Sequence, residues 1–147
     1  MSLKEKLTSD MKQAMKDKNK ELLTTIRLVN SMIKNEEIKL KVELNDDKVI
    51  EILNRELKQT NESLESYRVV NNTDKIQELE NRIVDIKKYL PQQLTENEIK
   101  DLITSIINNN GIEGKKDKGK LMGMLMPEVK GKADGRLVNK MVEDLLV

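Results

Sequence analysis

The chain has 147 residues, a length that suits one domain or two small ones, and 42 of them are Leu, Ile or Val, enough to form a hydrophobic core. Lys and Arg number 27 and Asp and Glu number 26, so the net charge of +1 creates no overall attraction to nucleic acid or membrane. Because Cys and His are absent, the sequence excludes disulfides, thiol nucleophiles, structural zinc sites and every catalytic triad that needs imidazole.

Two amphipathic helices are predicted at the start of the chain. Ser2 and Glu5 match a capping box, and apolar residues then recur every three or four positions as far as Met15. After a polar run at residues 16–20, the same spacing resumes between residues 22 and 33 and predicts the second helix.

Two longer helices are predicted next. Asn45 or Asp46 can cap the third helix, whose apolar positions run from residue 49 to residue 67. The fourth follows a polar stretch of Asn, Thr and Asp, and its apolar stripe reaches Leu90. We expect this helix to stop at Pro91, because proline lacks an amide N–H and disfavours helix in the residue before it.

The chain changes in character after Pro91, where we place a domain boundary. The prediction is an N-terminal helical domain at residues 1–91 and a C-terminal domain at residues 92–147. Nothing in the sequence favours a strand. The predicted fold class is therefore all-α, with about four helices in the first domain and three in a small tail domain.

Three shorter helices are predicted in the tail domain. Thr95 and Glu98 match a second capping box, placed before a cluster of isoleucines. A short helix over residues 118–126 is expected to end at Pro127, and a final amphipathic helix spans residues 135–146.

Glycine and positive charge concentrate in the same part of the tail domain. All six glycines lie within residues 111–135, which indicates tight turns and exposed backbone. Residues 115–140 carry eight basic and three acidic side chains, a net charge of +5, whereas the rest of the chain carries a net charge of −4. A concentrated basic segment is typical of a surface that binds phosphate groups.

The segment from Lys130 to Arg136 alternates basic residues with glycine just before a predicted helix start, where free amides and the helix dipole favour anions. The alternative is that Asp134 is an ordinary N-cap whose carboxylate occupies those amides. Either way Lys130, Lys132 and Arg136 remain able to contact phosphates around the turn.

The sequence offers no catalytic constellation. Two adjacent acidic pairs, at residues 36–37 and 46–47, would point in different directions on a helix, and the serines lack both a nucleophile-elbow motif and a basic partner. We therefore expect no catalytic residues, no metal site and no cofactor. The charged N-terminus lacks the apolar core of a signal peptide, and no segment is apolar enough to span a membrane, so we expect a cytoplasmic protein that does not associate with membranes.

Two segments, Gly119–Pro127 (GKLMGMLMP) and Lys130–Asn139 (KGKADGRLVN), resemble the YqeY family, as do the opening residues 3–15 and the Tyr89–Leu94 junction. That family's C-terminal half is similar to the tail domain of the B subunit of the tRNA-dependent amidotransferase. In that enzyme the tail contacts the outer corner of tRNA, while other domains carry out amidation. Family descriptions often include a carbon-nitrogen ligase that uses glutamine as amido donor.

The resemblance implies a tRNA-binding helical protein without its own amidation site. The RNA contacts that it implies are Lys120, Lys130, Lys132 and Arg136, with Lys140 one turn further along the last helix, and the residues that would shape the backbone are Gly119, Gly123, Gly131 and Gly135.

The sequence and its resemblance leave three functional hypotheses. The first is a module that recognises folded tRNA through its sugar-phosphate backbone and its shape. Both tyrosines lie outside the basic segment, so this segment has no aromatic side chain on which a base could stack. The second is a protein-interaction or oligomerisation module, accessory to an amidotransferase or another tRNA-handling complex. The third is a glutamine-dependent carbon-nitrogen ligase, which the side chains present do not support.

Overall fold

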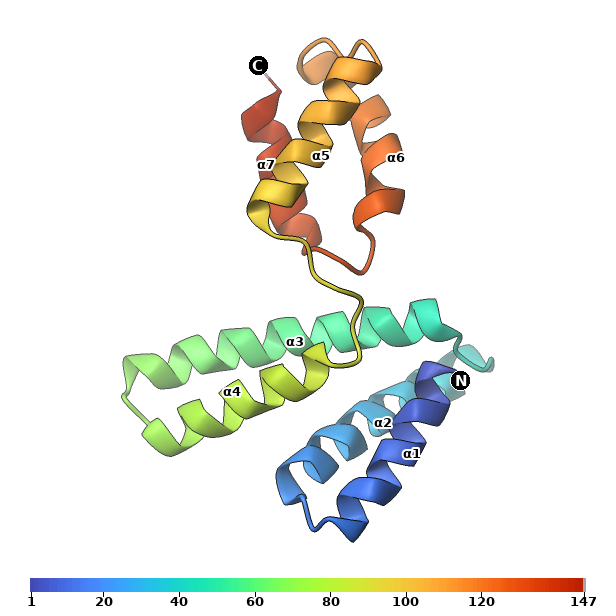
Figure 1. Cartoon of the computed structure of the whole chain (residues 1–147), viewed down its shortest axis with the longest axis vertical. Coiled ribbons are helices and arrows are strands. Elements are labelled where there is room, and N and C mark those ends of the chain that lie inside the picture. The colour runs from blue at the N-terminus through green and yellow to red at the C-terminus, as the bar shows by residue number, and fades with distance from the viewer. Residues whose placement is uncertain (147) are drawn as a thin grey trace. The chain divides into compact units, whose positions relative to one another are not determined.

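The structure, a computed structural model, describes residues 1–146, and over that range the protein is all-helical, with seven α-helices, one 3₁₀ turn and no strand (Figure 1). The predicted all-α fold class is thereby confirmed. The chain divides into two compact units, Met1–Leu90 and Pro91–Val147. Within the described residues, no helix is both long enough and apolar enough to cross a membrane.

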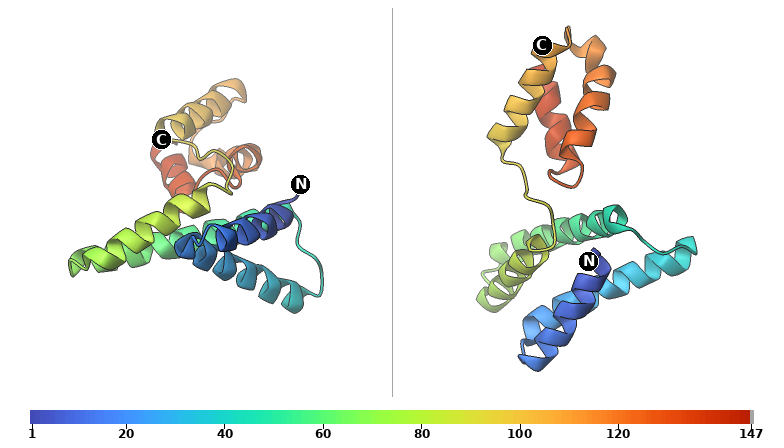
Figure 2. Two further views of the ribbon diagram at one scale, coloured as in Figure 1. Left: turned by 60° about the horizontal axis from the view of Figure 1, so that its bottom comes forward. Right: turned by 45° about the vertical axis from the view of Figure 1, so that its right-hand side comes forward.

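The first unit is built from two pairs of helices. Helix α1 (Leu3–Lys16) lies beside α2 (Lys20–Leu40), and α3 (Asp46–Val69) lies beside α4 (Thr73–Lys87), as both views in Figure 2 show. Each helix begins at a side chain that accepts a hydrogen bond from a backbone N–H three residues further on, which satisfies an amide that the helix leaves unpaired. The four capping residues are Ser2, Asn19, Asn45 and Asn72.

The predicted stripes of α1 and α2, of the first half of α3 and of the end of α4 meet in one core, while Leu64 of α3 and Leu79 of α4 are buried outside that cluster. The fully buried side chains of this core include Leu7, Ile26, Val49, Leu53 and Ile86. Burial of aliphatic side chains on this scale is the main favourable contribution to the stability of such a unit.

Helix α4 ends at Lys87, three residues before the position predicted for its end. The N–H groups of Tyr89 and Leu90 bond to carbonyls three residues back, at 3.1 and 3.2 Å, which tightens the chain into a turn. Leu90 precedes Pro91 and is therefore excluded from helical geometry, and the turn still buries both side chains. The Tyr89 hydroxyl donates a hydrogen bond of 2.6 Å to Asp10 of α1.

The second unit contains α5 (Glu96–Asn109), a 3₁₀ turn η1 (Lys115–Asp117), α6 (Lys118–Val129) and α7 (Gly135–Leu145). Thr95 caps α5 through the N–H of Glu98, as its position in the sequence predicts. The three helices surround a second core, separate from the first, whose members include Ile99, Ile103, Leu121, Leu125, Val138 and Val142.

Helix α6 continues through Pro127 to Val129, so the prediction that it ends at Pro127 is wrong. A proline in the last turn removes the single backbone hydrogen bond that its own N–H would have made to Gly123. The next amides still close the turn, since the N–H of Lys130 donates to the carbonyl of Met126 at 2.9 Å. Val129 is 1% exposed in the core, and its burial favours the extra residues of helix.

Candidate nucleic-acid interface

The turn between α6 and α7 is fixed to the segment that precedes α5. The backbone N–H of Leu94 donates to the carbonyl of Lys132 at 2.8 Å, and the side-chain amide of Gln93 donates to the carbonyl of Gly131 at 2.9 Å. Gly131 has a φ of 75°, a left-handed conformation that glycine adopts without steric cost. The turn is therefore held in one conformation by groups distant in sequence.

Four basic side chains surround this turn and are all exposed: Lys130, Lys132, Arg136 and Lys140, which we call the α6–α7 basic cluster. Arg136 and Lys140 are four residues apart on α7 and so share one face of that helix. Within residues 1–146, neither of these two, nor Lys132, forms an ion pair with an acidic side chain. Their charges are consequently available to an external anion.

One amide at the start of α7 is capped from within the chain. Asp134 Oδ1 accepts a hydrogen bond of 3.0 Å from the backbone N–H of Arg136. Of the two interpretations that the sequence left open at this helix start, the structure therefore contains the N-cap. An anion at this turn would be bound by exposed side chains of the α6–α7 basic cluster, and the capped amide would not contribute.

Lys120 lies at the other end of the second unit. Its Nζ donates a hydrogen bond of 3.2 Å to the carbonyl of Asn110, just past the C-terminus of α5, whereas the α6–α7 turn is attached to the segment before the N-terminus of α5. The 14 residues of α5 separate these ends by about 20 Å. Since the screening length at physiological salt is about 8 Å, the charge of Lys120 acts separately from the cluster.

The remaining basic residues of the segment are largely neutralised. Lys118 and Lys115 both pair with Glu143 of α7, the second at 3.9 Å, and Lys116 pairs with Glu113 at 3.3 Å. The hydrogen bond from Lys118 is the largest cause that lowers the pKa of Glu143 below its ordinary value. Three of the eight basic side chains in residues 115–140 are thus paired, and two of these, Lys115 of η1 and Lys118 of α6, contact Glu143 of α7.

Acidic side chains also flank the α6–α7 basic cluster. Glu128 is exposed in the last turn of α6, and Glu96 and Glu98 begin α5 at the same end of the unit. The attraction for a polyanion is therefore confined to the cluster itself and does not extend over the whole end of the unit.

Of the four glycines proposed to shape the backbone, only Gly131 has a positive φ. A Cβ atom added to Gly119, Gly123 or Gly135 would meet no atom within 4 Å, so in these three the structure shows neither a special conformation nor a close packing contact. Positive φ occurs instead at Gly111 and also at Gly114, just ahead of η1, two positions that the sequence prediction did not single out.

No group of three or more acidic side chains within residues 1–146 is arranged to hold a metal ion.

Comparison with known proteins gives two findings. The sequence model of the family described as Yqey-like protein matches residues 4–146. The chain is also 29% identical, over 145 residues, to "Altered inheritance of mitochondria protein 41, mitochondrial" of Pyrenophora tritici-repentis (strain Pt-1C-BFP). That alignment covers 96% of this chain and 79% of the relative. Both similarities thus extend over the two units.

Proposed function

Since this chain belongs to the Yqey-like protein family, we propose that it is a tRNA-binding helical protein whose second unit contacts folded RNA through the α6–α7 basic cluster. In this proposal the protein has no amidation site of its own and acts as an accessory to a tRNA-handling complex. The observation that carries the proposal is the exposure of four cationic side chains around a turn whose backbone is fixed.

The chemistry of the cluster favours phosphate contacts. Arg136 offers a planar fork of donors that matches two phosphate oxygens, and the lysines add compact charges nearby. A rigid turn loses little conformational entropy when it binds, which favours a ligand whose phosphates are themselves held in a fixed arrangement. Folded RNA meets that condition better than an unstructured strand.

The protein would recognise the shape of the RNA and not its bases, because aromatic side chains are missing from the second unit. The chain has two tyrosines and no Phe or Trp, and both Tyr67 and Tyr89 belong to the first unit. Recognition of single-stranded RNA usually stacks bases on aromatic rings or on arginine. Residues 119–139 resemble the YqeY family, and the similarity to the amidotransferase tail domain that this resemblance implies favours the same ligand class.

The test compares the binding of folded tRNA and of an unstructured RNA of equal length by fluorescence anisotropy, at about 0.15 M salt. The variant is Lys132→Ala/Arg136→Ala/Lys140→Ala. The matched control, Lys12→Ala/Lys16→Ala/Lys34→Ala, removes the same charge from exposed lysines of α1 and α2.

We expect the wild-type protein to bind tRNA more tightly than the unstructured RNA. The cluster variant should lose tRNA affinity by at least about tenfold, and the slope of its log affinity against log salt concentration should correspond to about two to three fewer phosphate contacts. The control should bind nearly as wild type does. Equal losses in the two variants, or equal affinity for the two RNAs, would contradict the proposal.

A further inference from the structure

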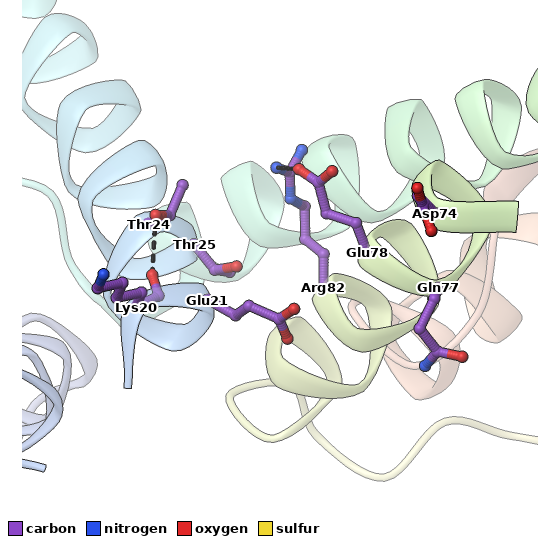
Figure 3. A pocket seen from close by; sticks show the side chains of 8 residues that line it. All are labelled: Lys20, Glu21, Thr24, Thr25, Asp74, Gln77, Glu78 and Arg82. Carbon is purple, nitrogen blue, oxygen red and sulfur yellow. Dashed lines mark hydrogen bonds and ion pairs between the residues drawn. The ribbon is translucent and has the colours of Figure 1, made fainter. Parts of the chain in front are cut away.

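The first unit contains a polar hollow of about 380 Å³ between α2 and α4 (Figure 3). Its size lies within the range of about 300–1,000 Å³ that small-molecule sites occupy. The hollow is far in the sequence from the α6–α7 basic cluster and belongs to the other compact unit, so a ligand site there is independent of the proposed function.

The hydroxyl group of a buried residue faces this hollow without a partner. Thr25 is only 4% exposed, lines the hollow, and makes no hydrogen bond through its side chain within residues 1–146. The neighbouring Thr24 hydroxyl, by contrast, donates to the carbonyl of Lys20 at 2.8 Å. In Figure 3 the Thr25 side chain extends from α2 towards α4. Within residues 1–146 no fully buried side-chain oxygen or nitrogen lacks a partner, so the Thr25 hydroxyl is accessible from the hollow and can bond to a group that enters it.

A partly buried arginine side chain, that of Arg82, lies across from it, on α4. The Arg82 side chain is 21% exposed, and its nearest carboxylate oxygen, on Glu78, is 3.7 Å away, longer than a hydrogen bond. Arginine carries five N–H donors in a planar fork, so most of its donor capacity at this site is unused within the described residues. Such a fork recognises a carboxylate through two parallel hydrogen bonds.

Carboxylates reach the same hollow from both helices. Glu21 projects from α2, with one oxygen accepting a hydrogen bond of 2.9 Å from Asn81, while Glu78 and Asp74 line the α4 side (Figure 3). The lining thus holds three carboxylates and two cationic side chains, Lys20 and Arg82, so a simple anion would meet the carboxylates and a simple cation would leave the Arg82 fork unused. The lining therefore selects a ligand that carries both charges a short distance apart.

We propose that the hollow between α2 and α4 binds a small zwitterion with the chemistry of a free α-amino acid. Its carboxylate would accept hydrogen bonds from Arg82 and the Thr25 hydroxyl, and its ammonium group would donate to Glu21 and Glu78. Arg82 and Thr25 would then use donor capacity that the free protein leaves unused, while Glu21 and Glu78 would accept from the ammonium group beside their present contacts with Asn81 and Lys75.

The test is a titration of the full-length ¹⁵N-labelled protein, followed by amide chemical shifts, with three probes at millimolar concentration: L-leucine, L-glutamine and L-lysine. Any probe that binds is then compared with its N-acetyl derivative, which lacks the ammonium, and its α-amide, which lacks the carboxylate. The expected result is saturable shifts at the amides of residues 24–25 and 77–78 with at least one amino acid, lost with both derivatives.

Variants identify the groups responsible. Arg82→Gln and Thr25→Val should each weaken the binding, by about tenfold or more for the arginine, while Arg27→Gln, at an exposed arginine of α2 that does not line the hollow, should leave it unchanged. If Arg82→Gln fails to fold by circular dichroism, Glu21→Gln at the exposed rim replaces it. The proposal is overturned if no probe shifts these amides, if either derivative binds as well as its parent, or if the variants bind as wild type does.

Discussion

Asp134 holds the backbone N–H of Arg136 with its own carboxylate, at 3.0 Å, in the middle of the α6–α7 basic cluster. A negative charge therefore occupies the helix start that would otherwise attract a phosphate, and it lies among the four cations proposed to contact RNA. The cap stabilises α7, and at the same time its charge opposes the binding of a polyanion.

Replacing Asp134 by Asn separates these two effects. Asparagine caps about as well as aspartate, so Asp134→Asn should leave the free energy of unfolding nearly unchanged while it strengthens tRNA binding several-fold at fixed salt. Asp134→Ala should lower the free energy of unfolding by about 1 kcal/mol. Urea unfolding and anisotropy titrations measure the two quantities. A weaker affinity for Asp134→Asn would show that the carboxylate itself positions the RNA contact.

Alanine substitutions at two glycines of the second unit should change the free energy of unfolding in opposite directions. Gly123 has ordinary helical geometry and open space around its Cβ position, so Gly123→Ala should raise the free energy of unfolding by about 0.5–1 kcal/mol. Gly131 has a φ of 75°, so Gly131→Ala should lower it by about 1–2 kcal/mol. Urea unfolding followed by circular dichroism tests both. Destabilisation by Gly123→Ala would reveal a contact that the open helix surface does not show.

Helix positions were predictable from local patterns, because each cap and each apolar repeat acts over a few residues. Ser2, Asn45 and Thr95 cap the helices that the sequence assigns to them. The predicted ends at Leu90 and Pro127 were wrong for opposite reasons. Tertiary burial of Val129 extends α6 beyond a proline, whereas α4 stops short because Tyr89 and Leu90 form a turn of bonds to carbonyls three residues back, ahead of Pro91.

The candidate sites were less predictable, because they depend on packing between distant segments. The closeness of Lys130, Lys132 and Arg136 follows from their adjacency in sequence. The separation of Lys120 from them follows from the way α6 runs back along α5, which periodicity does not encode. The hollow is lined by Thr25 of α2 and Arg82 of α4, which are 57 positions apart in the sequence, and no sequence motif marks it.

The pair formed by Lys118 and Glu143 predicts a dependence of stability on pH. The hydrogen bond from Lys118 lowers the pKa of Glu143 below its ordinary 4.5, so the unfolded chain binds this proton at a higher pH than the folded chain does. The pair therefore stabilises the second unit above about pH 4.5, and this contribution is lost as the pH falls through the folded-state pKa.

In Glu143→Gln the loss of unfolding free energy between pH 7 and pH 3 should accordingly be smaller than in wild type. Urea midpoints measured at several pH values give this quantity, and Glu96→Gln, at an exposed acidic residue of α5 with no ion pair within residues 1–146, serves as the control. Identical pH profiles for Glu143→Gln and wild type would mean that the ion pair contributes nothing in solution.

Lys120 and Lys132 should respond to substitution in opposite ways. Lys120 bonds the Asn110 carbonyl at the C-terminus of α5, where a cation interacts favourably with the helix dipole, so Lys120→Ala should cost about 0.3–1 kcal/mol of stability and leave tRNA affinity nearly unchanged. Lys132→Ala should leave stability nearly unchanged, weaken tRNA binding several-fold, and reduce the salt dependence by about one phosphate contact. Urea unfolding and anisotropy at several salt concentrations test both variants. An equal loss of affinity in the two would mean that the RNA spans the roughly 20 Å between the ends of α5, and that both ends of the second unit belong to the interface.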